Sequence, residues 1–149
     1  MKLLRDFEGC KEYEKIVSRA VATENNLTFE LQNESGFAIS KWKIDDCVLK
    51  HSDGSKCDYL IIIEERKTCF WIELKDQDLD DACLQIYSSI KNIEGFSGYQ
   101  HKARIVLGRF IEDRNRIESL RYTNFKKLIN TIGGKQHLSY KTKVITEKI

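Results

Sequence analysis

Two apolar, β-rich runs that nearly touch in the sequence constrain this chain more than any other feature. Residues 58–64 and 68–75 are rich in the β-branched and aromatic side chains that favour strands. Only the tripeptide Glu65-Arg66-Lys67 separates them. A polar connection this short predicts a β-hairpin near the middle of the chain.

The segments on either side of the hairpin alternate between helix and strand patterns. Apolar residues three and four apart predict an amphipathic helix over residues 8–25, and weaker strand patterns cover residues 27–31 and 37–49. After the hairpin, Asp78 is a good N-cap for a helix that runs to about residue 93. A strand over residues 103–109, a helix over 117–132 and a strand over 138–145 follow, the helix being closed by Gly133-Gly134.

This order predicts one α/β domain that spans residues 1–149. The chain contains no proline, no internal repeat and no Gly/Ser linker, so no domain boundary is expected. A hairpin followed by alternating helices and strands is typical of a mixed sheet, and we expect helices on both of its faces.

Cysteine and histidine usage predicts neither a disulfide framework nor a zinc site. The five cysteines are odd in number and form no Cys-x-x-Cys pair, so we expect reduced, mostly buried thiols. The three histidines lie far apart. The longest apolar run, residues 59–63, is too short to span a bilayer, and the start of the chain lacks the apolar stretch of a signal peptide. A cytoplasmic protein is expected.

Charge is distributed unevenly along the chain, although the net charge is only +2. Residues 1–99 hold 13 Lys/Arg and 19 Asp/Glu, whereas residues 100–149 hold 12 and 4. Such a basic segment indicates either a polyanionic partner or a solvated basic face. The candidates for phosphate contacts are Lys102, Arg104, Arg109, Arg114, Arg116, Arg121, Lys126, Lys127, Lys141 and Lys143.

Charged residues end the second arm of the hairpin. Side chains alternate along a strand, so Glu73 and Lys75 share one face about 7 Å apart and Leu74 points to the other. A two-residue turn sets Asp58 opposite either Glu73 or Lys75, depending on which residues form it. Both registers bring Asp58 to the same face. Alternatively, Glu73 and Lys75 are only a surface ion pair that contributes little stability.

Two adjacent carboxylates and an ammonium suit metal-assisted hydrolysis. The carboxylates repel each other and are best stabilised by a hard divalent cation such as Mg²⁺, which keeps waters that a substrate phosphate can displace. The cation activates a bound water and offsets charge that builds on the phosphate, while Lys75 orients the water. These three residues therefore predict phosphodiester hydrolysis.

The pattern Asp58, fourteen residues, then Glu73-Leu74-Lys75 and a helix resembles the PD-(D/E)xK nuclease superfamily. The match covers about residues 56–86, with Cys57 where proline is common. The resemblance implies a restriction-endonuclease-like αβββαβ core. It also implies that Asp58, Glu73 and the Leu74 carbonyl bind Mg²⁺ or Mn²⁺, and that Lys75 and Gln85 serve catalysis.

Many members of that superfamily place a further metal-binding glutamate on the first helix. Here Tyr13 takes the core-facing position of the expected helix, and Glu12 and Glu14 lie about 100° to either side of it. Neither is assigned as a ligand.

The resulting expectation is a Mg²⁺-dependent nuclease that acts on DNA rather than RNA. The chain is too short for a separate specificity domain, so specificity is expected from a homodimer, a protein partner or nucleic-acid shape. One alternative is a catalytically inactive module that binds nucleic acid or a protein. Another is an inhibitor or immunity-type protein whose acidic part meets a basic target.

Overall fold

The computed structural model describes residues 1–109, 120–133 and 138–149. Its elements in chain order are β1 (Lys2–Leu3), η1 (Leu4–Cys10), β2 (Lys11–Ile16), β3 (Arg19–Glu24), β4 (Leu27–Gln32), β5 (Ala38–Lys43), η2 (His51–Asp53), β6 (Tyr59–Ile63), η3 (Glu64–Arg66), β7 (Thr68–Lys75), α1 (Leu79–Asn92), β8 (Ile93–Glu94), β9 (Gln100–Leu107), α2 (Leu120–Gly133), β10 (Leu138–Thr142) and β11 (Val144–Lys148).

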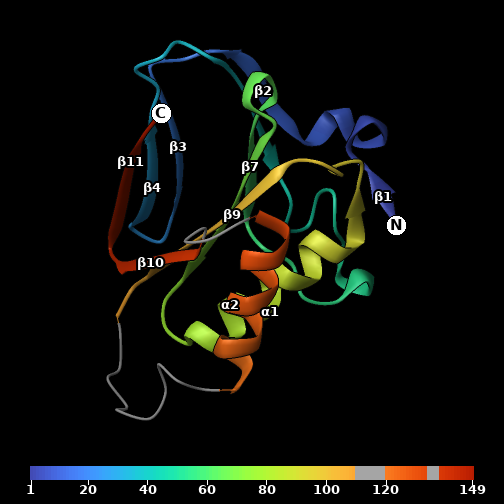
Figure 1. Ribbon diagram of the computed structural model, residues 1–149, viewed down its shortest axis with the longest axis vertical. Helices are drawn as coiled ribbons and strands as arrows, with labels where there is room; N and C mark the ends of the chain where they lie inside the picture. The colour runs from blue at the N-terminus through green and yellow to red at the C-terminus, as the bar shows by residue number, and fades with distance from the viewer. Residues whose placement is uncertain (110–119, 134–137) are drawn as a thin grey trace.

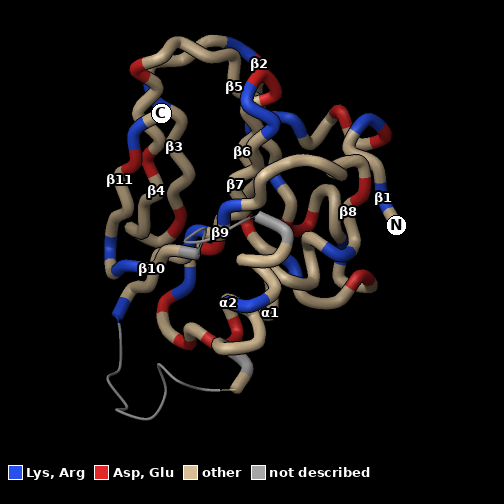
Figure 2. The backbone as a smooth tube through the Cα atoms, viewed as in Figure 1, with Lys and Arg blue, Asp and Glu red and all other residues tan. Residues whose placement is uncertain are grey.

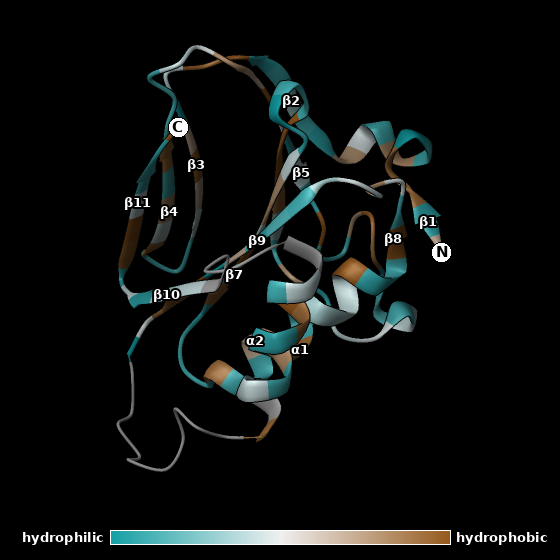
Figure 3. Cartoon of the chain, viewed as in Figure 1, coloured by the Kyte–Doolittle hydropathy of each residue, from teal (hydrophilic) through white to brown (hydrophobic). Residues whose placement is uncertain are grey.

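A six-stranded mixed sheet with the order β10-β9-β7-β6-β5-β2 forms the centre of the molecule. Strands β6 and β7 are the expected antiparallel hairpin, and β9 lies parallel to both β7 and β10. The outer strand β2 is rich in Lys and Glu, is mostly exposed, and is largely hydrophilic in Figure 3. Charge along such an edge discourages pairing with another chain. The α/β class and the mixed sheet are confirmed.

Different layers cover the two faces of the central sheet (Figure 1). Helices α1 and α2 lie together on one face, where Ala82 and Ile129 pack in the same buried cluster as Trp71. The other face is covered by a second, three-stranded sheet with the order β11-β4-β3, whose Phe29 packs in a cluster with Phe70. The prediction of helices on both faces is therefore wrong.

The expected first helix is also wrong, because residues 8–25 form the end of η1 and the strands β2 and β3. Asn25 and Asn26 both have positive φ, 52° and 64°, as a two-residue type I′ hairpin turn requires. This turn pairs β3 with β4 and buries Ala20 and Ala22 completely. The αβββαβ core expected from the resemblance thus lacks its first helix, whereas β5, β6, β7, α1 and β9 follow in the expected order.

Helix α1 confirms the expected N-cap, since the Asp78 carboxylate accepts a hydrogen bond from the Asp81 backbone N–H at 3.0 Å. The predicted helix over 117–132 corresponds to α2, although residues 117–119 lie outside the described residues. In the part of the chain that the structure describes, no helix has the length and apolarity needed to cross a membrane.

The last predicted strand is divided in two. Lys143 has a φ of 69° and turns the chain between β10 and β11. Strand β10 then pairs with β9 in the central sheet, and β11 pairs in parallel with β4 in the three-stranded sheet. Residues 138–148 therefore connect the two sheets.

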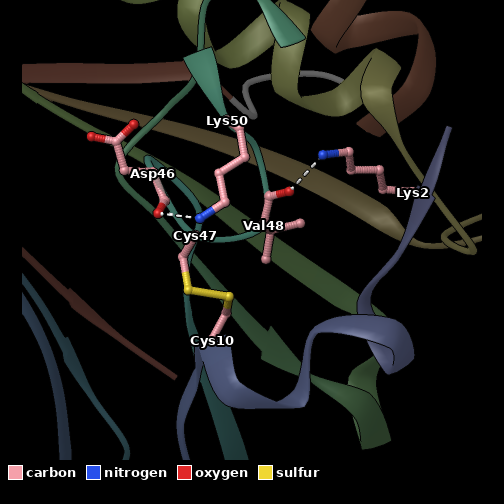
Figure 4. The surroundings of a disulfide bond; sticks show 6 residues. All are labelled: Lys2, Cys10, Asp46, Cys47, Val48 and Lys50. Carbon is pink, nitrogen blue, oxygen red and sulfur yellow. Dashed lines mark hydrogen bonds between the residues drawn. A yellow bond between two sulfur atoms is a disulfide. The ribbon is translucent and has the colours of Figure 1, made fainter. Parts of the chain in front are cut away.

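A disulfide joins Cys10 to Cys47, which corrects the expectation that all five cysteines are reduced (Figure 4). The bond ties η1 to the loop after β5, where Lys50 donates to the Asp46 carbonyl at 3.0 Å. The two cysteines are 37 residues apart, and no spacing motif marks such a pair. The other three, Cys57, Cys69 and Cys83, are free and buried as expected.

Candidate functional site

The register of the central hairpin brings Asp58 beside Glu73. Strands β6 and β7 pair from Tyr59 with Ile72 to Ile63 with Thr68, so one further step sets Asp58 opposite Glu73. This is the first of the two registers expected from the sequence, although the turn is formed by residues 64–67 and not by the two residues expected. The Asp58 side chain turns toward the end of β7, where its Oδ2 accepts a hydrogen bond from the Leu74 N–H at 2.8 Å.

Both carboxylates are buried at the end of the hairpin. Asp58 is 7% exposed and Glu73 only 3%. Burial, followed by the charge of Asp58 and a hydrogen bond to it, raises the pKa of Glu73 to about 10. Within the described residues, Glu73 Oε1 is buried without a hydrogen-bond partner. In the absence of a cation, Glu73 therefore holds a proton at neutral pH.

Glu24, which the sequence analysis missed, is a third acid at this site. It is the last residue of β3, next to the Asn25-Asn26 turn. Burial, the charge of Asp58 and a shared hydrogen bond with Asp58 raise its pKa, partly offset by Lys43. Its Oε2 is also buried without a hydrogen-bond partner among the described residues. The sequence feature that could have located Glu24 is the Asn25-Asn26 turn, because this turn brings the three-stranded sheet over the end of β6.

The glutamates considered for the first helix lie elsewhere. Glu12 and Glu14 are in the edge strand β2, where Glu12 pairs with Lys41 at 2.8 Å and Glu14 with Lys11 at 3.3 Å. Glu24 is instead the further glutamate whose pKa is raised by burial and by the charge of Asp58.

Lys75 ends β7 and forms an ion pair with Asp81 in the first turn of α1. Burial of Lys75 lowers its pKa, because burial disfavours the charged form. The hydrogen bond to Asp81 and the charges of Asp81 and Glu73 outweigh this effect, so the pKa of Lys75 is raised overall. Lys75 is therefore a cation close to the acidic side chain of Glu73. Figure 2 shows further acidic residues along the connection from β7 into α1.

Gly108, the residue after β9, lies close to the end of β7 that carries Lys75. The Gly108 N–H donates to the Lys75 carbonyl at 2.8 Å. A Cβ atom at residue 108 would lie 2.6 Å from Asp76 Oδ1 and 2.8 Å from the Asp76 carbonyl oxygen. Only glycine fits here without displacing the backbone after Lys75.

Helix α1 also holds the segment before Asp58. The Ser89 hydroxyl accepts a hydrogen bond from the Cys57 N–H at 2.8 Å and donates to the Gln85 carbonyl at 2.8 Å. Ser89 is completely buried. The Gln85 side chain is half-buried, its Oε1 has no hydrogen-bond partner in the described part of the chain, and it makes no hydrogen bond to Asp58, Glu73 or Lys75. The helix thus positions Asp58 through the backbone.

The donor set suits a hard divalent cation. Across residues 1–109, 120–133 and 138–149, no three His, Cys, Asp or Glu side chains are already arranged as a metal site. Instead, burial and the charge of Asp58 raise the pKa of both Glu24 and Glu73. Mg²⁺ commonly takes one or two carboxylates and completes its shell with water. Asp58 and the unpartnered oxygen of Glu73 match that requirement. The Leu74 carbonyl points to the same edge of β7 as its N–H, which faces Asp58.

The basic C-terminal third does not form one uninterrupted cationic face. Arg104 is 5% exposed and forms a two-point ion pair with Glu147, whereas Lys126, Lys127, Lys141 and Lys143 are exposed. Two other candidates for phosphate contacts, Arg114 and Arg116, lie outside the described residues, as does the side chain of Arg121.

Comparison of the chain with protein-family models, with curated proteins and with solved structures gave no match in any of the three. The function is therefore inferred from the chemistry of the site itself.

Proposed function

We propose that this chain is a nuclease that hydrolyses phosphodiester bonds with the help of Mg²⁺ or Mn²⁺, with DNA rather than RNA as its substrate. The observation that carries the proposal is the buried pair Asp58 and Glu73, with the Lys75 ammonium at the same end of the hairpin. One oxygen of Glu73 has no hydrogen-bond partner among the residues that the structure describes. Burying two acids together is costly unless protons or a cation neutralise them.

Each residue has a distinct part in this proposal. Asp58 and Glu73 hold the cation, with the Leu74 carbonyl as a further oxygen ligand. A bound divalent ion supplies an acidified water and offsets negative charge on the phosphate. Lys75 donates hydrogen bonds to the attacking water or to the phosphate, and Gln85 offers a second polar contact from α1. Glu24 adds a further acidic group beside Asp58, which favours a cation there.

The ion pair between Lys75 and Asp81 sets a condition for this chemistry. Lys75 carries three N–H donors, so it can keep Asp81 while it donates to water or phosphate. Asp81 thereby holds the ammonium at the end of β7. We place the activity in the cytoplasm, where the Cys10–Cys47 disulfide is subject to reduction. We expect a second copy or a protein partner to supply specificity.

A catalytically inactive binding module is the second candidate. The observation that favours it is that Lys75 already has a carboxylate partner in Asp81, as a purely structural lysine would. Metal binding separates the two candidates, because a binding module has no need of a cation between Asp58 and Glu73.

The test combines metal binding with cleavage. Purified protein is incubated with plasmid, linear, single-stranded and branched DNA and with RNA, in Mg²⁺, Mn²⁺ or EDTA, and Mn²⁺ binding is measured by calorimetry. We expect metal-dependent cleavage that falls about 100-fold or more in Lys75→Ala and Glu73→Gln. Glu73→Gln should also lose the calorimetric signal.

The matched control is Glu65→Gln, which removes an exposed acid at the turn of the same hairpin. It should cleave and bind Mn²⁺ as the unmodified chain does. Equal cleavage by Glu73→Gln and the unmodified chain would refute the assignment. Absence of both cleavage and Mn²⁺ binding in the unmodified chain would favour the binding module.

A further inference from the structure

A polar pocket lies between the two sheets, beside the turn that joins β6 to β7 and away from Asp58 and Glu73. It encloses about 420 Å³. Thr68, which begins β7, and Gln100, which begins β9, lie at its edge. From Thr68 to Glu73 the strand advances five residues, or about 17 Å. The pocket is therefore a separate feature from the carboxylates at the other end of β7.

Cationic side chains from three different elements line this pocket. They are Arg66 of η3, Lys102 of β9 and Lys148 of β11. Two of these cations lie beside aromatic rings. The Arg66 guanidinium is 5.2 Å from the centroid of the Phe37 ring, and Lys102 Nζ is 5.4 Å from the centroid of the Phe70 ring. The pocket thus presents positive charge on an apolar floor.

Two of these three cations have no carboxylate partner among the described residues. Lys148 pairs with Glu34 at 3.4 Å, but in the described part of the chain neither Arg66 nor Lys102 forms an ion pair. Lys102 is half-buried, and this burial is the main reason that its pKa is lowered. The charges of Arg104 and Arg66 lower the pKa further, and the charge of Glu147 partly opposes the change. A cation in such a position is stabilised by an incoming anion.

We propose that the pocket formed by Arg66, Lys102 and Lys148 binds a phosphate group, carried either by a free nucleotide or by a nucleic-acid backbone. Arg offers a planar fork of donors that matches phosphate oxygens, and Lys adds a compact point charge. The volume is within the range of small-ligand sites. Phe37 and Phe70 keep the two unpaired cations directed at the cavity.

This site does not depend on the proposed nuclease activity. Phosphate binding by Arg66 and Lys102 needs no metal, so it can be measured in EDTA, where metal-dependent cleavage is absent. A chain that fails to cleave any nucleic acid can still bind phosphate here.

The experiment is calorimetric titration in EDTA at fixed ionic strength with three probes: pyrophosphate, ADP and a short DNA duplex. The variants are Arg66→Gln and Lys102→Gln, and the control is Lys91→Gln, which removes an exposed positive charge on α1. We expect each pocket variant to weaken binding of at least one probe about tenfold or more. The control should bind every probe as the unmodified chain does.

The outcomes separate the sources of phosphate. Weakened binding of pyrophosphate or ADP identifies a free-phosphate ligand, and weakened binding of the duplex alone identifies backbone phosphate. The proposal is overturned if no probe binds, or if Lys91→Gln weakens binding as much as the pocket variants do. Arg66 is exposed in a turn, so Arg66→Gln keeps the test valid even if Lys102→Gln does not fold.

Discussion

Replacing Glu73 with glutamine should stabilise the metal-free protein at neutral pH, although it removes a proposed metal ligand. Glutamine has nearly the shape of a protonated glutamate and never ionises. The pKa of Glu73 rises from an ordinary value of 4.5 to about 10 on folding. Between these two values the native state keeps a proton that the unfolded state has released.

The sign and size of the effect follow from that difference. Because the native state binds more protons, the free energy of unfolding falls as pH rises above 4.5, by up to about 1.4 kcal/mol per pH unit. At pH 7 the cost to the unmodified chain is about 3 kcal/mol. The second amide N–H of glutamine lacks an acceptor, which costs about 1 kcal/mol. Glu73→Gln should therefore be about 2–3 kcal/mol more stable at pH 7 and nearly neutral at pH 5.

Urea unfolding in EDTA, followed by the fluorescence of the buried Trp42 and Trp71, measures this difference at each pH. Adding Mg²⁺ or Mn²⁺ should then stabilise the unmodified chain and leave Glu73→Gln unchanged. A stability difference that stays constant from pH 5 to pH 8 would refute the reasoning, because it would mean that Glu73 ionises alike in the native and unfolded states.

Two further predictions concern the disulfide and the end of β9. Replacing both Cys10 and Cys47 with serine should lower the free energy of unfolding by about 3–4 kcal/mol, as expected for a bond across 37 residues. Dithiothreitol should destabilise the unmodified chain and not the double variant, and equal urea midpoints for the two chains without reductant would contradict this. Gly108→Ala should cost about 1–3 kcal/mol because its Cβ meets the Asp76 backbone, whereas Gly9→Ala, with no atom within 4 Å of the added Cβ, should change stability by less than about 0.5 kcal/mol. Urea unfolding of both alanine variants tests this, and comparable losses would refute it.

Local signals were sufficient for the hairpin and for α1. The apolar runs and the short polar connection between them predict β6 and β7 and leave two registers open, of which the structure adopts the one that sets Asp58 opposite Glu73. Asp78 predicts the start of α1 because a cap acts within a single turn. These features depend on residues close together in the sequence.

The N-terminal region was predicted wrongly because its apolar spacing fits two periodicities. Ala20 suits an amphipathic helix and also the buried face of β3, and pairing with β4 decides in favour of the strand. Glu24 could not be assigned without that hairpin. The Cys10–Cys47 bond depends on how η1 packs against a distant loop, which no local pattern encodes.

The parallel pairing of β11 with β4 ties the site to the order in which the chain is synthesised. Strand β4 bonds to β3 on one edge and to β11 on the other, and Ile145 is buried in the same apolar cluster as Phe29. Until residues 144–148 have left the ribosome, one edge of β4 stays open and the layer that carries Glu24 is incomplete. A nascent chain can therefore form the β6–β7 hairpin before the layer that carries Glu24 has all three of its strands.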